Sequence, residues 1–225
     1  MKQYLFFFSL LFWLPTNVQA QSDYPSKIST VDAAFSFGNG FSTAFSYNQL
    51  FGLGAKKRFK IGAGVRLTSL FASNLDYITA PASLTSKPET IDTINFAKTQ
   101  ANALNVSLQV QYSFKKLDIG FNIDALGASF GAAQTGLVAA SGSALNKTNQ
   151  SAKLTGFNLL LVGDNDRGSL NSEFYVRYWL TEKIGIRGGG SFIFTEYTTD
   201  KVIASDNSRF RNKSFQPMIA LSIKL

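Results

Sequence analysis

A strict alternation of apolar and polar residues constrains this fold more than any other feature of the sequence. It is clearest in the last eleven residues, where every second position is apolar: Phe215, Pro217, Ile219, Leu221, Ile223 and Leu225. The intervening positions are Gln216, Met218, Ala220, Ser222 and Lys224. Because successive side chains of a strand point to opposite faces, this spacing predicts a β-strand with one apolar face.

Seven further segments carry the same period of two. With the last strand, they cover about 30–38, 41–53, 59–68, 104–114, 117–125, 173–180, 184–195 and 209–225. The pattern predicts an all-β fold, an eight-stranded antiparallel up-and-down transmembrane β-barrel. In the alternative, a soluble barrel, the apolar face would point inward. Small residues on the polar face, and aromatic residues at strand ends such as Phe59, Tyr112, Phe114 and Tyr178, favour the membrane.

Residues 1–20 have the pattern of a signal peptide. Lys2 precedes an apolar stretch at 4–14, and Val18-Gln19-Ala20 resembles a cleavage site, which leaves residues 21–225 as the barrel domain. The apolar stretch is shorter than the ~20 residues that a spanning helix needs. We therefore expect export and a place in the cell outer membrane. The chain has no Cys, so neither a lipid anchor on Cys nor a disulfide is expected.

The connections between strands alternate in length. Those at 54–58, 115–116 and 181–183 are short, and we expect long outer loops near 72–101 and 131–167, with another at 198–208. Short periplasmic turns and longer outer loops are typical of outer-membrane barrels. The segment 157–162 is unusually apolar for an outer loop. It either extends a hairpin by pairing with 169–173 above the membrane, or adds a membrane strand, giving ten strands in all.

With this leader, strand pattern and terminal strand, residues 21–225 resemble the small outer-membrane β-barrel proteins, the grouping of outer-membrane proteins A, X and W. They look closest to the outer-membrane β-barrel domain proteins of Bacteroidota type. The resemblance implies insertion by the barrel assembly machinery. The terminal Leu225 differs from the Phe or Trp usual in these proteins, which weakens the expected insertion signal.

Charged residues on the polar face indicate a filled lumen. The alternation points three acids and three bases inward: Asp32, Asp124, Glu173, Arg66, Arg177 and Arg187. An eight-stranded barrel is just wide enough for its own side chains, so we expect these groups to pair and plug it. The alternative is a proton or ion pathway. The chain has no His, the usual general base near neutral pH, so we expect no enzymatic activity and no cofactor.

The formal net charge of +8 suggests an anionic partner. In an exported chain that partner is expected to be lipid rather than nucleic acid. Arg209, Arg211 and Lys213 share the outward parity of the last strand, and we expect them to contact phosphates of outer-membrane lipopolysaccharide; solvated loop charges are the alternative. Residues 164–168 lack the ligand spacing of a calcium loop and are interpreted as a turn, so no metal site is expected.

The sequence as a whole predicts a non-enzymatic barrel with a plugged lumen. Its outer loops would act in surface interaction, adhesion or envelope integrity, with a protein partner that the sequence does not identify. Two alternatives remain open. One is a narrow channel or carrier for small apolar solutes, and the other is an accessory barrel of a secretion or assembly machine.

Overall fold

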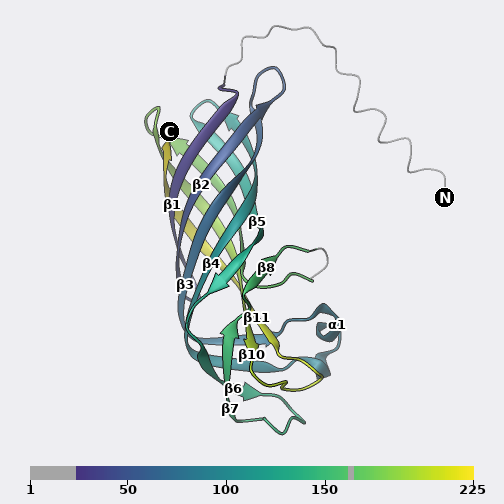
Figure 1. Ribbon diagram of the computed structural model, residues 1–225. Coiled ribbons are helices and arrows are strands. Elements are labelled where there is room, and N and C mark those ends of the chain that lie inside the picture. Colours follow the sequence, from purple (N-terminus) through teal and green to yellow (C-terminus); the bar gives the residue numbers. More distant parts are fainter. Residues whose placement is uncertain (1–23, 162–164) are drawn as a thin grey trace, which may run out of the picture.

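Eight antiparallel strands close into a ring in the computed structural model, which describes residues 24–161 and 165–225 (Figure 1). The expected signal peptide at 1–20 lies outside these residues. The ring strands are β1 (Lys27–Phe37), β2 (Phe41–Leu53), β3 (Phe59–Thr79), β4 (Thr93–Phe114), β5 (Leu117–Phe130), β9 (Leu170–Trp179), β10 (Ile184–Thr199) and β11 (Arg209–Lys224).

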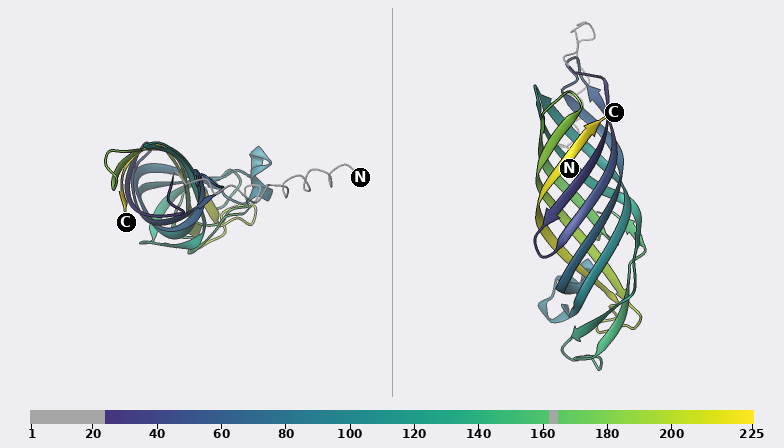
Figure 2. Two further views of the ribbon diagram at one scale, coloured as in Figure 1. Left: turned by 90° about the horizontal axis from the view of Figure 1, so that it is seen from above. Right: turned by 90° about the vertical axis from the view of Figure 1, so that its left-hand side faces the viewer.

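Each ring strand pairs with its neighbours along the chain, and β11 pairs with β1 to close the ring, as the end-on view of Figure 2 shows. The closing register joins Val31 to Ile223 and Phe35 to Ile219. β1 begins and β11 ends at the end of the barrel that carries the short turns (Figure 1). The eight-stranded up-and-down barrel predicted from the alternation is confirmed.

The outward face of this ring is apolar, and its side chains are exposed. Leu104, Leu108 and Phe114 of β4, for example, are about half exposed. Aromatic side chains gather at both ends of this belt. Phe51, Phe59, Tyr112, Phe114 and Tyr178 lie near the short turns, and Phe37, Phe71, Phe130, Phe192 and Phe215 lie near the opposite end. We refer to the second group as the outer aromatic edge.

Beyond the outer aromatic edge, a second and smaller ring of strands continues four strands of the first. It adds the hairpin of β6 (Gln134–Ala139) and β7 (Asn149–Leu154), which pairs with β4 on one side and β10 on the other. The outer end of β11 pairs with β3 at Phe210 and Thr79, which closes this ring. We call the six-stranded assembly of β3, β4, β6, β7, β10 and β11 the outer ring.

The outer ring corrects two expected loops. Strand β3 runs to Thr79 and β4 begins at Thr93, so the loop expected over 72–101 is only the short connection that carries α1 (Ala82–Thr85) and η2 (Pro88–Thr90). The loop expected over 131–167 contains β6, β7 and β8 (Phe157–Leu159). The alternation reverses its sense here: Leu75, Tyr77 and Phe96 point inward and are buried, whereas Asp76 and Asn95 point outward. Most of the large apolar side chains of this ring thus point inward.

The described part of the apolar segment, residues 157–161, adds no further strand to the eight-strand ring. Strand β8 pairs with β5, joining Leu126 to Leu159, and the eight-strand ring is kept. On its other side a single bridge joins Leu159 to Arg167, just before the expected partner segment 169–173. β8 therefore takes the place of β9 as the partner of β5 beyond Ile123 and Ser172, where β5 and β9 stop pairing.

Within the described residues, the two helices span four and three residues, and neither is long and apolar enough to cross a membrane.

Candidate functional site

The six charged residues predicted to face the lumen all lie inside the eight-strand ring, and each is at most 2% exposed. They come from five strands, and the ion pairs join them into one chain. Arg66 Nη2 lies 2.5 Å from Asp124 Oδ1, and Arg66 Nη1 lies 3.3 Å from Glu173 Oε2. The sequence prediction that these groups converge and pair is consistent with this geometry.

Arg187 holds the middle of this chain of charges. Its Nη2 donates to Glu173 Oε2 at 2.8 Å, and its Nη1 donates to Asp32 Oδ2 at 3.1 Å. Its guanidinium also stacks on the Tyr175 ring, 4.4 Å from the centroid. Arg177 continues the chain from Asp32, at 3.3 Å, to Asp118, at 3.5 Å. Because every ion in this buried interior has an opposite charge beside it, the desolvation cost of burying it is offset. We call this set of residues the lumen charge network.

Two further charged residues, Asp118 and Lys60, also lie on the inward face and belong to the network. Lys60 Nζ donates to Ser113 Oγ at 2.8 Å, and that hydroxyl donates to Asp118 Oδ1 at 2.6 Å. Trp179 Nε1 donates to the second oxygen of Asp118 at 2.7 Å. The network therefore holds four acids and four bases. Their inward-facing positions in the alternation could have indicated that they belong to the network. Their depth in the lumen could not be predicted from the alternation.

Both ends of the lumen are filled. At the end with the short turns, the Trp179 ring is buried beneath the Lys224 ammonium, which lies 4.2 Å from its centroid. At the other end, the rings of Tyr77, Phe96 and Tyr197 pack together inside the outer ring, with centroids 4.8–5.2 Å apart. These three rings belong to an apolar core of thirteen buried residues, which closes the outer mouth.

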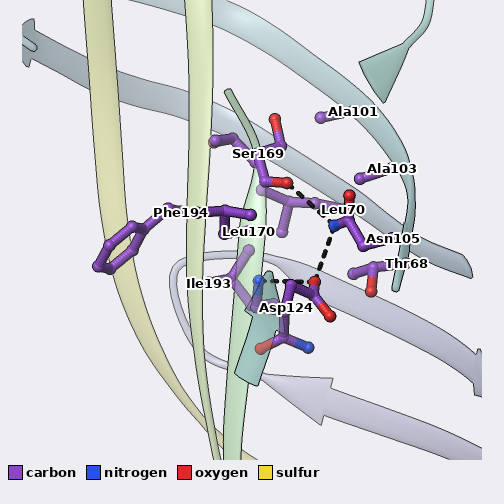
Figure 3. A pocket seen from close by; sticks show the side chains of 12 residues that line it. Thr68, Leu70, Ala101, Ala103, Asn105, Asp124, Ser169, Leu170, Ile193 and Phe194 are labelled. Carbon is purple, nitrogen blue, oxygen red and sulfur yellow. Dashed lines mark hydrogen bonds between the residues drawn. The ribbon is translucent and has the colours of Figure 1, made fainter. Parts of the chain in front are cut away.

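A small cavity separates the lumen charge network from this apolar core. It holds about 10 Å³, and its lining includes the polar side chains of Asn105 and Asp124 and the apolar side chains of Leu70 and Leu170 (Figure 3). The Asp124 carboxylate is fully engaged, since it accepts from Arg66, from Asn105 Nδ2 at 2.8 Å and from the Asn171 amide at 2.9 Å. A volume of this size corresponds to about one water molecule.

Burial also changes the tyrosines of the apolar core, which lie beyond the outer aromatic edge. Burial raises the pKa of Tyr77 to about 12, against a weaker opposing effect of its hydrogen bond with Thr195 Oγ1 at 2.8 Å. Burial likewise raises the pKa of Tyr197, whose hydroxyl donates to the Gln100 carbonyl at 3.2 Å. Both phenols therefore stay neutral over the physiological range.

The three basic residues predicted to contact lipid do not form one exposed patch. All three keep outward parity, but only Lys213 is exposed, with its ammonium 5.3 Å from the Phe194 centroid. Arg209 and Arg211 both bind the fully buried Glu196, at 2.8 and 2.9 Å. The segment that follows β8 covers them, because the Asp166 carbonyl accepts from both guanidinium groups. Arg211 is only 3% exposed, and contact of these three residues with lipopolysaccharide stays a prediction.

The turn at 164–168 lies partly outside the described residues, at Asp164. Of the rest, the Asp166 carboxylate accepts from the Leu161 amide at 2.7 Å, and Gly168 has a positive φ of 79°. The Asp166 carboxylate thus joins the two described sides of this turn. Among the described residues, no cluster of His, Cys, Asp and Glu side chains is arranged to hold a metal ion.

No family model matches this sequence, and no curated protein matches it. Among solved structures, Neisserial surface protein A aligns over 88% of this chain and 96% of its own, with 10% identity and a TM-score of 0.39. The toluene transporter TbuX of Ralstonia pickettii aligns over 83% of this chain and 69% of its own, with 13% identity and a TM-score of 0.20. Membership of the Bacteroidota-type family stays a prediction, and the barrel assignment rests on the closed ring of strands in this chain.

Proposed function

We propose that the protein is a non-enzymatic outer-membrane barrel with a sealed lumen, which holds the outer ring at the cell surface for interaction, adhesion or envelope integrity. The observation that carries this proposal is the apolar belt around the eight-strand ring, bounded at both ends by aromatic side chains. Such a belt is costly in water and suits a bilayer, and its aromatic edges suit the two head-group layers.

The contents of the lumen support a structural rather than a transport role. Charged side chains fill its middle, and the apolar core fills its outer mouth. Each carboxylate of the lumen charge network is paired with a base, which leaves it poorly suited to acid/base catalysis. The chain also lacks His. A narrow channel or a carrier through the lumen would need both fillings to move.

The outer ring is the part of the barrel suited to a protein partner. It is built from paired strands around a packed core, so its exposed turns are presented with little conformational freedom to lose on binding. The connection between β6 and β7, at 140–148, projects farthest from the barrel (Figure 1). An accessory role in a secretion or assembly machine would use the same surface, and insertion itself would require the barrel assembly machinery.

Cysteine labelling on intact cells tests the placement and the orientation together. The chain contains no Cys, so Ala144→Cys in the β6–β7 connection and Lys56→Cys in the short turn before β3 each introduce a single thiol at an exposed position. We expect a membrane-impermeant maleimide to label Ala144→Cys on intact cells and Lys56→Cys only after lysis. Equal labelling of both variants on intact cells, or of neither, would refute the proposed placement.

A further inference from the structure

The net positive charge of the protein is concentrated at the inner end of the barrel, the end that carries the short turns (Figure 1). Eight basic side chains lie there, six on the three short turns and two at strand ends, Lys27 and Lys224. Among the described residues, the opposing charges there are Glu182 and the carboxylate of Leu225. The lumen charge network is balanced, with four acids and four bases. The strand ends and connections of the outer end hold nine basic and seven acidic described side chains, so that end is nearly neutral.

Five of the basic side chains at the inner end lie on two neighbouring turns, which connect β2 to β3 and β4 to β5. The Ser113 amide donates to the Arg58 carbonyl at 2.9 Å, which holds the two turns side by side. Tyr24 spans both turns, since its hydroxyl accepts from the Lys115 amide at 2.6 Å and its ring centroid lies 5.8 Å from Arg58 Cζ. We call the following five residues the inner basic patch: Lys56, Lys57, Arg58, Lys115 and Lys116.

The inner basic patch lies directly beside the apolar belt. Its turns are tight, with positive φ angles of 53° at Lys57 and 55° at Lys115. Phe59 and Phe114, the strand residues that adjoin the turns, are exposed on the outward face, and the Lys115 ammonium lies 5.6 Å from the Phe114 centroid. Aromatic girdles mark the level of lipid head groups. In the proposed placement, the patch therefore lies at the phosphates of the inner leaflet.

The patch fits a layer of phosphate groups better than it fits a protein. Lys56, Lys115 and Lys116 are exposed, and Lys57 is half-buried. The connection between β4 and β5 has only two residues, so it projects no surface beyond the head groups on which a folded partner could rest. Clusters of four or more Lys and Arg side chains beside a membrane attract anionic lipids, with a gain of about fivefold in affinity for each charge. Each ammonium can donate charge-assisted hydrogen bonds to phosphate oxygens.

We propose that the inner basic patch binds the phosphate groups of anionic phospholipids in the inner leaflet, with phosphatidylglycerol as the occupant. Lys56, Lys115 and Lys116 contact the phosphates, and the acyl chains lie along the apolar belt at Phe59 and Phe114. The attraction is one-sided because the outer end is nearly neutral, so it also favours the orientation with the short turns facing inward. The inference rests on the proposed outer-membrane placement.

Native mass spectrometry of the folded barrel in detergent, titrated with phosphatidylglycerol or with phosphatidylcholine, measures the preference for the anionic lipid. The inner variant replaces four lysines of the patch with Gln, at positions 56, 57, 115 and 116, and we expect its preference to fall at least about tenfold. The outer variant makes the same change at four exposed lysines of the outer end, at positions 87, 98, 147 and 153, and should keep its preference. Raising the salt from about 0.1 M to about 1 M should weaken the preference of the unmodified protein, because the ions screen the patch.

The two variants carry the same net charge, so their comparison separates the patch from the charge of the whole protein. Equal losses of preference in both variants would overturn the proposal, and so would an unchanged preference in the inner variant. Heat-modifiable gel mobility reports the folded barrel in every sample. A barrel that is labelled at Ala144→Cys on intact cells but shows no preference for phosphatidylglycerol refutes this patch and leaves the proposed function standing. Labelling of Lys56→Cys alone on intact cells refutes the placement, and the inner-leaflet assignment with it.

Discussion

Replacing Arg187 with Met tests the view that the lumen charge network holds the barrel together. Arg187 is 1% exposed, and its two hydrogen bonds to Asp32 and Glu173 are charge-assisted. Met keeps much of the side-chain volume, so the change removes charge and hydrogen bonds more than packing. Each hydrogen bond to a charged group contributes about 1.5–3 kcal/mol. Breaking a buried ion pair costs about 3–5 kcal/mol.

Asp32 and Glu173 keep other partners when Arg187 is replaced, which favours a cost at the lower end of the range for breaking a buried ion pair. Asp32 keeps Asn48 at 2.7 Å and Arg177 at 3.3 Å, and Glu173 keeps Asn122 at 2.9 Å and Arg66 at 3.3 Å. The network nevertheless becomes one positive charge short. We expect Arg187→Met to lower the free energy of unfolding by about 3 kcal/mol. Adding Glu173→Gln restores the charge balance, and we expect the double variant to recover about 1 kcal/mol.

Urea unfolding of the barrel in lipid vesicles measures these differences. In protein prepared as residues 21–225, Trp179 is the single tryptophan, and its hydrogen bond to Asp118 places it in the network, so its fluorescence reports the lumen. Arg167→Met makes the same chemical change at an exposed position and should cost less than about 0.5 kcal/mol. If Arg187→Met costs no more than Arg167→Met, the charges do not stabilise the barrel and the reasoning fails.

Three further predictions concern packing, pH and topology. A Cβ on Gly120 would lie 2.4 Å from Tyr175 Cζ, so Gly120→Ala should lower the free energy of unfolding in urea by about 1–3 kcal/mol. This cost should shrink in a Tyr175→Leu background, and equal costs in both backgrounds would refute the contact. The Tyr77 pKa is about 12 when folded against 10.0 when unfolded, so its contribution to outer-ring stability is complete below pH 10 and is lost as the pH rises toward 12. Near-ultraviolet circular dichroism of the aromatic core should follow this loss, and Tyr77→Phe should reduce it; an identical pH profile in the variant would contradict the assignment. Lys153 and Thr198 face each other across β7 and β10, so the double variant Lys153→Cys/Thr198→Cys should form a disulfide on mild oxidation. The control double variant Lys153→Cys/Lys56→Cys should form none. Failure of the first pair to cross-link would refute the outer ring.

The eight-strand ring and the lumen charges were predictable because both follow from a period of two. Asp32, Arg66 and Arg187 were placed inward by parity alone, and closure of the barrel brings them together. The pairing pattern within the network was not predictable, since it depends on how far each strand is shifted along its neighbour. The register shift at Val106 and Ser107, which turns Phe130 outward on β5, is one such detail.

The outer ring was missed for a physical reason. Beyond Phe71, most large apolar side chains of β3 and β4 turn inward, and a search for an outward apolar stripe finds none there. Strands β6 and β7 have only six residues each, and their partners on β4 and β10 are distant in sequence. Burial of Arg211 went unpredicted for a related reason, because the segment that covers it, at Asp166, belongs to another connection.

The sealed lumen is the central claim, and ion conductance of the purified barrel in planar lipid bilayers tests it most directly. The lumen charge network, the 10 Å³ cavity and the apolar core of the outer ring occupy the described part of the lumen one after another. The account predicts that the inserted, heat-modifiable barrel produces no single-channel steps at either polarity. Stable, reproducible steps from the same preparation would contradict it and would favour a channel.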